Sequence, residues 1–214
     1  GGLGMLLAFL LGIFTTTWLM PGVVLMNQSL FLLAIGGALA VFLVGFFDDV
    51  RPLRALLKLF FQVAIAFAMW YFGVRVEVLS LLGSGQEQIG TLVSIIITIG
   101  WYVVLMNSIN LVDGLDGLAG GICLIGALSL VGVSFSLSYS EDVLIGAVFS
   151  TLTGASVLGF LFFNWHPAKT FMGDGGSLLL GFLLATSSII GSTKTPTLLA
   201  LSVPMVALAL PLSD

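Results

Sequence analysis

Long apolar runs alternate with short polar segments along this chain. Most runs have the length of about 17–25 residues that one helical crossing of a bilayer requires. They are rich in Gly and Ala rather than alternating at period two, which excludes an outer-membrane β-barrel. We therefore predict an all-α integral membrane protein, a polytopic bundle of about eight transmembrane helices. The predicted spans are residues 3–20, 30–47, 55–72, 89–106, 118–139, 143–163, 177–191 and 197–212, the last two being short.

One segment between the third and fourth spans has the pattern of β-structure. Apolar residues alternate over 74–79, and Gly83-Ser84-Gly85 marks a turn, so a small extracytoplasmic β-hairpin is expected. Neither repeats nor linkers divide the chain, and 1–214 is predicted to be a single domain. The chain begins with Gly1-Gly2 and stops directly after an apolar run, so it is expected to be incomplete at both ends.

Composition supports the membrane assignment and narrows the partners. Of the 214 residues 59% are hydrophobic and only 7% are charged, against about 25% charged residues in soluble domains. The chain has no basic run that would bind nucleic acid. The one cysteine, Cys123, lies in an apolar run and is expected to be inert packing.

The order of the spans places three polar segments on the same side of the membrane. If the chain crosses at every span, residues 48–54, 107–117 and 164–176 share one face. The cations of that face are Arg51, Arg54, Lys58 and Lys169, and those of the other face are Arg75 and Lys194. The positive-inside rule then predicts that the three segments lie on the cytoplasmic face of the inner (plasma) membrane.

The first polar segment carries two adjacent carboxylates, Asp48 and Asp49. Adjacent carboxylates repel unless a cation or proton lies between them. Two interpretations remain open: a solvated loop with ion pairs to Arg51 or Arg54, or a site for a metal-bound phosphate. Lys58 lies four residues before Gln62 on the next helix, so the two share a face. Lys58 either snorkels to the interface or holds a phosphate.

The second polar segment has four oxygen-bearing side chains at a spacing of three residues. They are Asn107, Asn110, Asp113 and Asp116. In a helix they would follow one face, and Asp and Asn oxygens suit a hard cation such as Mg²⁺. Helix packing would explain the neighbouring glycines, but not carboxylates at the bilayer edge, each of which costs about 2.5–3.5 kcal/mol at membrane depth.

The third polar segment opens a helix at Gly173-Asp174-Gly175-Gly176-Ser177. Helix N-termini attract anions, so a carboxylate there suggests a phosphate bridged through Mg²⁺, with a plain helix cap as the alternative. His166 is expected to have an interfacial structural role. Phe171 either stacks on a base or faces lipid.

Together the three segments favour metal-assisted phosphoryl chemistry. The competing classes are a transporter and a non-catalytic scaffold.

Three motifs in order carry a resemblance to a known family. DDVRPL with Lys58 and Gln62 downstream, then NSINLVDGLDGLAGG, then FNWHPAKTFMGDGGSLLLGF resemble the polyprenyl-phosphate N-acetylhexosamine-1-phosphate transferases over nearly the whole chain. The UDP-GlcNAc-using branch is the most similar. The resemblance implies that undecaprenyl phosphate attacks the β-phosphorus of a UDP-N-acetylhexosamine and releases UMP, initiating cell-envelope glycan synthesis. Phospho-MurNAc-pentapeptide transfer in peptidoglycan synthesis is the alternative.

The resemblance also implies roles for individual residues. The implied catalytic residues, of which one of the first two is a base or an organiser, are Asp48, Asp49, Asp113 and Asp116. The implied substrate-binding residues are Lys58, Asn107, Asn110, Asp116, Asn164 and Phe171. The implied ligands of Mg²⁺, or of Mn²⁺, are Asp174 and Asn110. The family has a further cytoplasmic loop after the position of Asp214, so the isolated chain is expected to be impaired. Small residues from Gly36 to Ala40 would allow packing within one chain or in a homodimer.

Overall fold

The structure is a computed structural model that describes residues 1–80, 86–136 and 140–192. Six helices in this part are long and apolar enough to cross a membrane: α1 (Gly2–Leu19), α3 (Gln28–Val50), α5 (Thr91–Val112), α6 (Leu118–Ser136), α7 (Glu141–Asn164) and α8 (Gly173–Ser192). A seventh apolar helix, α4 (Ala55–Tyr71), has 17 residues. The prediction of an all-α, multi-pass membrane protein is confirmed. The eighth predicted span, 197–212, lies outside the described residues.

The helix α8 begins at Gly173, where the third polar segment was expected to open a helix. Two predicted span ends were wrong, because both were placed too early along the chain. The helix α5 runs to Val112 instead of ending at residue 106, and α3 continues through Asp49 to Val50 instead of ending at residue 47. Polar residues at these ends contact other helices rather than lipid, so hydropathy alone ended the spans too early. The short helix α2 (Pro21–Met26), where a loop was expected, has Pro21 in its first turn, a position at which the fixed φ of proline favours a helix start.

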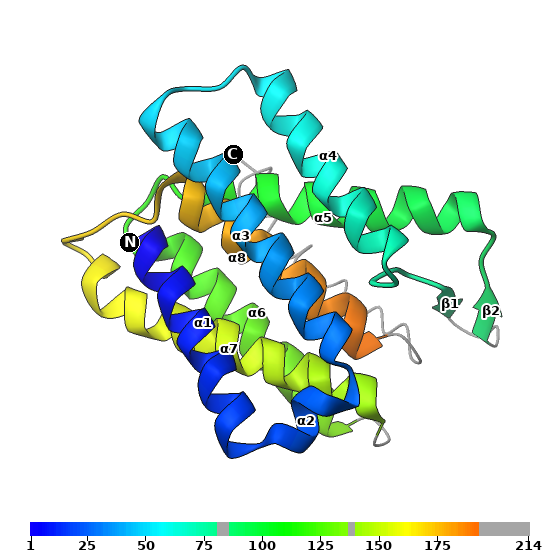
Figure 1. The fold of residues 1–214 in the computed structure, drawn as a ribbon. Coiled ribbons are helices and arrows are strands. Elements are labelled where there is room, and N and C mark those ends of the chain that lie inside the picture. The colour runs from blue at the N-terminus through cyan, green and yellow to red at the C-terminus, as the bar shows by residue number, and fades with distance from the viewer. Residues whose placement is uncertain (81–85, 137–139, 193–214) are drawn as a thin grey trace.

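Two short strands lie between the C-terminal end of α4 and the N-terminal end of α5 (Figure 1). The strand β1 (Val78–Ser80) pairs antiparallel with β2 (Gln86–Gln88). The turn between them, residues 81–85, lies outside the described residues. The hairpin as a whole and its place on the extracytoplasmic side therefore stay predictions.

The helix α8 is the centre of the bundle and packs against α1, α3, α5, α6 and α7 (Figure 1). Small residues allow this close packing: a Cβ on Gly181 would lie 2.5 Å from the Cα of Met106 on α5. Hydrogen bonds between buried groups add specificity, because the Tyr102 hydroxyl lies 2.9 Å from Thr186 Oγ1 and Trp101 Nε1 donates to Ser188 Oγ at 2.9 Å. These contacts hold the middle and the C-terminal half of α8 against α5.

The backbones of α3 and α8 approach closely at Gly45, and this contact yields a prediction. A Cβ on Gly45 would lie 2.6 Å from the Cα of Gly175 and would also collide with the carbonyl of Asp174. We expect Gly45→Ala to force the two helices apart and to lower stability by about 1–3 kcal/mol, the usual range for overpacking. The measurement is the melting temperature in detergent.

The matched control for this prediction is Gly36→Ala on the same helix. No described atom lies within 4 Å of a Cβ at Gly36, and alanine is the better helix former. We expect this variant to melt at or above the wild-type temperature. Equal melting temperatures for the two variants would contradict the close α3–α8 contact.

Candidate functional site

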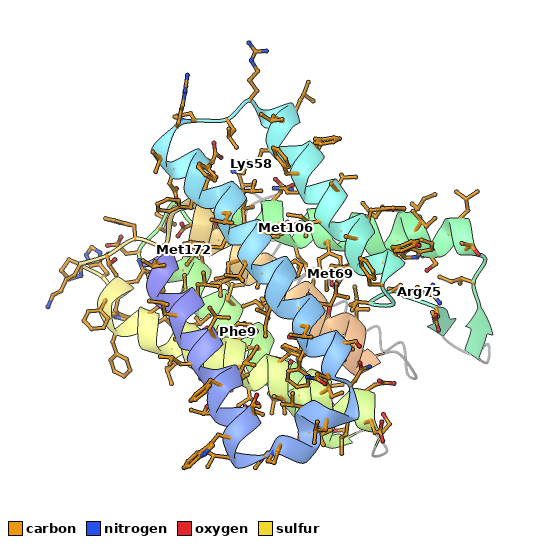
Figure 2. The ribbon with its side chains drawn as sticks, in the orientation of Figure 1. Phe9, Lys58, Met69, Arg75, Met106 and Met172 are labelled. Atoms are coloured by element: carbon orange, nitrogen blue, oxygen red, sulfur yellow. The ribbon has the colours of Figure 1, made fainter. Side chains whose placement is uncertain are left out.

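The three polar segments meet at one end of the bundle, around the ammonium group of Lys58 (Figure 2). Lys58 Nζ lies 2.8 Å from Asp48 Oδ2 and forms an ion pair with Asp174 Oδ2. It also donates to Asn110 Oδ1 at 3.4 Å. One cation on α4 thus joins carboxylates from α3 and α8 and an amide from α5.

The amide group of Asn110 completes the contacts of Asp174. Asn110 Nδ2 donates to Asp174 Oδ1 at 2.7 Å and to Ser177 Oγ at 2.9 Å. Ser177 is buried in the first turns of α8. The sequence analysis assigned Ser177 no role of its own, and the only signal for it was its place in the polar segment that opens the helix.

The two adjacent aspartates have different partners, because successive side chains of a helix point about 100° apart. Asp48 accepts a hydrogen bond from the backbone N–H of Leu53 at 2.6 Å in addition to its contact with Lys58. One of the two open interpretations was a pair of Asp48 or Asp49 with Arg51 or Arg54, and no such ion pair is present among the described residues. That interpretation was wrong, because the lysine of the next helix lies closer to the carboxylate.

Asp49 caps the N-terminus of α8 from a neighbouring helix. Its Oδ1 accepts from Asp174 N at 2.7 Å and its Oδ2 accepts from Gly175 N at 3.0 Å. A carboxylate at this position also interacts favourably with the helix dipole. Gly173 has φ +65°, and a Cβ there would lie 2.7 Å from Asp49 Oδ2. The cap is therefore Asp49, and the side chain of Asp174 is left to face Lys58 and Asn110.

Asp113 lies just after α5 and is the carboxylate without a direct partner at this end of the bundle. No hydrogen bond or ion pair to its side chain is present among the described residues. The pKa of Asp113 is raised to about 7. The main cause is burial, and the negative charges of Asp174 and Asp49 contribute to the same shift. A cation that entered beside Asp113 would relieve this repulsion.

The raised pKa makes stability depend on pH. An unfolded aspartate has a pKa of about 4, so the folded state holds the extra proton between pH 4 and 7, and the free energy of unfolding falls as the pH rises through that window. We expect Asp113→Asn to melt about 2–4 °C above the wild type at pH 8, without divalent cations, and to differ little from it at pH 4.

The control for this pH dependence is Asp142→Asn, in the first turn of α7. A carboxylate there favours the helix, so this variant is expected to gain nothing at pH 8. A stabilisation by Asp113→Asn that is the same at both pH values would show that Asp113 does not titrate near pH 7.

Two residues predicted to serve the nucleotide side, Asp116 and Asn164, connect two loops of the chain. Asp116 Oδ2 accepts from Ala168 N at 3.0 Å and lies 3.0 Å from His166 Nδ1, and the pKa of Asp116 is lowered by these two contacts. Asn164 is 3% exposed, accepts from Gly117 N at 3.0 Å and donates to the Thr170 carbonyl at 2.9 Å. Both polar atoms of the Asn164 amide are therefore used within the fold, and a positioning role suits this residue better than direct binding.

Two further predicted residues differ in their surroundings. Phe171 is 68% exposed at the same end of the bundle, so it is free to contact a ligand. Asn107 on α5 has partners within the protein: its Nδ2 donates to Oε1 of Gln62 on α4 at 2.6 Å and to the Val103 carbonyl at 2.7 Å. Its predicted contact with substrate has no support in this geometry.

The oxygen atoms around Lys58 suit a hard cation that is also bound by phosphate oxygens of a substrate. Asp48 and Asp174 direct carboxylate oxygens, and Asn110 its amide oxygen, toward the ammonium group of Lys58, and such oxygens are the ligands that Mg²⁺ prefers. Among the described residues no group of three or more His, Cys, Asp or Glu is arranged to hold a metal ion alone. A bound metal would therefore rely on ligands from the substrate and from water as well.

Comparisons with known proteins identify relatives of this chain. The chain is 37% identical over 179 residues, 83% of its length and 49% of the relative, to the probable undecaprenyl-phosphate N-acetylglucosaminyl 1-phosphate transferase of Bacillus subtilis. It is 42% identical over 154 residues, 68% of the chain and 38% of the relative, to the decaprenyl-phosphate N-acetylglucosaminephosphotransferase of Mycobacterium leprae. It is 36% identical over 191 residues, 82% of the chain and 56% of the relative, to the phospho-N-acetylmuramoyl-pentapeptide-transferase of a Thermoanaerobacter species.

The chain thus spans about half the length, or less, of these curated relatives. The sequence profile described as Glycosyl transferase family 4 matches residues 31–192, which include every residue named at the site around Lys58. The chain belongs to glycosyl transferase family 4.

Proposed function

We propose that the protein transfers N-acetylglucosamine 1-phosphate from a UDP-sugar to a polyprenyl phosphate and releases UMP. The observation that carries this proposal is the Lys58 ammonium held between Asp48 and Asp174 at the end of a membrane-spanning bundle. A lipid phosphate and a water-soluble nucleotide can both reach such a position. The names of the relatives from Bacillus subtilis and Mycobacterium leprae support the same acceptor and the same sugar.

The proposed reaction exchanges one phosphoanhydride for another. An oxygen of the lipid phosphate forms a bond to the β-phosphorus of the UDP-sugar, and the bond from that phosphorus to the bridging oxygen breaks, so that UMP leaves with the electron pair. A lipid phosphate is already ionised near pH 7, so no base is needed. Catalysis then depends on positioning the reactants and on neutralising their charge.

The residues of the site divide this work. Lys58 would approach the phosphates when substrate enters, while Asp48 retains the ammonium group near them. Asp49 would act as the organiser, since it fixes the first turn of α8 and with it Asp174. Asp174 and the oxygen of Asn110 would hold Mg²⁺, or Mn²⁺ in its place. That ion would supply positive charge to the diphosphate.

The nucleotide would lie on the side of Asp113 and Asp116. Asp116 and Asn164 hold the loop after α7 in place, and this loop presents the exposed ring of Phe171 for stacking on the uracil base. The excess of cations at this end supports a cytoplasmic active site in the inner membrane. A homodimer stays a prediction.

The test uses membranes that contain the protein in its full natural length. Undecaprenyl phosphate, Mg²⁺ and UDP-GlcNAc labelled in the sugar are added, and the label is followed into the lipid phase. Transfer that requires Mg²⁺ and is reversed by added UMP is expected. Transfer only from UDP-MurNAc-pentapeptide would favour the second candidate, which the 36% identical Thermoanaerobacter relative represents. No transfer from any UDP-sugar would overturn the proposal.

A further inference from the structure

We propose that Gln62 and Asn107 form a positioning pair that sets the place of the Lys58 ammonium group. This inference rests on the proposed function, in which Lys58 acts on the reacting phosphates. Neither side chain touches Lys58, and neither is placed against the substrates. The pair acts through the position of α4 relative to α5.

The geometry of α4 and α5 is that of a two-step polar ladder. Lys58 donates to Asn110 Oδ1 at 3.4 Å, and one turn further along, Asn107 Nδ2 donates to Gln62 Oε1 at 2.6 Å. A longer second bond joins Gln62 Nε2 to Asn107 Oδ1 at 3.4 Å. Asn107 is itself fixed to its own helix through the Val103 carbonyl. The two amides therefore fix the position of α4 along the axis of α5.

Burial singles out Gln62 within α4. The buried residues of this helix are Gln62, Ala66 and Met69, and Gln62 is 1% exposed. Lys58 lies near the start of the helix and Met69 near its end (Figure 2). Burying an amide without a hydrogen-bond partner destabilises a fold. The hydrogen bonds to Asn107 offset this cost for Gln62.

The apolar surface of α4 does little to fix its register. Most of its large side chains face outward, among them Leu56 at 82% exposed, Phe60 at 64% and Tyr71 at 66%. Among the described helices it contacts α3 and α5. Lipid chains are as apolar as these side chains, so sliding along α5 changes their burial little. A slip of one residue moves Lys58 by about 1.5 Å, and a displacement of about 1 Å is enough to lower a rate by about 10²-fold.

The first test replaces the amide with an apolar group of similar size. Gln62→Leu is expected to lower kcat by about 10–100-fold in the membrane assay, with the KM for UDP-GlcNAc within about twofold of the wild type, because bound-state contacts are kept. The control is Ser94→Ala, which removes the bond from Trp70 Nε1 to Ser94 Oγ between the same two helices, far from Lys58. This control is expected to keep kcat within about twofold.

Two combinations separate positioning from general packing. Exchanging the amides, Gln62→Asn with Asn107→Gln, keeps the combined length of the pair and is expected to recover most of the activity that each single change loses. In a double-mutant cycle, Gln62→Leu is expected to add little to the loss caused by Lys58→Met, whereas Ser94→Ala should be additive with it. Additive effects for Gln62→Leu, or an unchanged kcat, would overturn the inference.

The same cycle can be measured without enzymatic activity. If the pair places Lys58 against its two carboxylates, Lys58→Met should lower the melting temperature less in the Gln62→Leu background than in the wild type. Equal shifts in both backgrounds would overturn the inference. Absence of label transfer in the wild type would instead count against the proposed function, while the melting cycle would still decide whether Gln62 positions Lys58.

Discussion

Asp174→Asn is expected to lower the rate of phosphosugar transfer by about 10²–10³-fold, the usual effect of removing one electrostatic contact at a reacting group. The change removes the charge that faces Lys58 and the stronger acceptor for Asn110. The fold should persist, because Asp49 binds the backbone N–H groups of residues 174 and 175 rather than the Asp174 side chain. The measurement is label transfer in membranes, normalised to the amount of inserted protein.

A suitable control is Glu141→Gln, which removes a carboxylate from the exposed first turn of α7 at the other end of the bundle. It should retain the wild-type rate. If Asp174→Asn also retained a rate within about threefold of the wild type, then Asp174 would not act on the reacting phosphates or on a metal.

Lys58→Met is expected to lower the same rate by about 10²-fold for a different reason. The ammonium group separates Asp48 from Asp174, and without it two carboxylates from different helices face each other at low exposure. Raised Mg²⁺ should restore part of the activity of Lys58→Met, since another cation can replace the lost charge. It should not restore Asp174→Asn, because that variant lacks the carboxylate that is proposed to hold the metal. Rates at increasing Mg²⁺ distinguish the two variants.

The control for Lys58 is Arg75→Met. Arg75 also pairs with a carboxylate, Glu77, at 2.7 Å and lies over the ring of Trp70, but it is beyond the other end of α4 (Figure 2). This variant should transfer label at the wild-type rate. A rate for Lys58→Met that matches that of Arg75→Met would show that the charge of Lys58 has no part in the reaction.

Two pairs of residues that the sequence suggested would act together have different contacts in the structure. From spacing alone, Asp48 and Asp49 formed one acidic pair and Asn107 and Asn110 one ligand face. In the fold Asp48 faces Lys58 while Asp49 caps α8. A turn of helix separates Asn110, which contacts Asp174, from Asn107, which contacts Gln62. Asp48 and Asp49 thus have separate roles because they point in different directions around the helix axis, and Asn107 and Asn110 because they lie one turn apart along it.

The sequence by itself determined the helical class, the approximate positions of the membrane spans in the described part and the placement of three polar segments at one end. These follow from the cost of transferring side chains and backbone into lipid, which each stretch of chain carries on its own. Only the tertiary structure decided that α5 extends to Val112, that Asp49 caps a helix more than a hundred residues away, and that Gln62 is buried against Asn107. Those outcomes depend on how neighbouring helices are rotated and shifted against one another. The rotation and shift come from close packing at small residues such as Gly45 and Gly181, which no single stretch of sequence specifies.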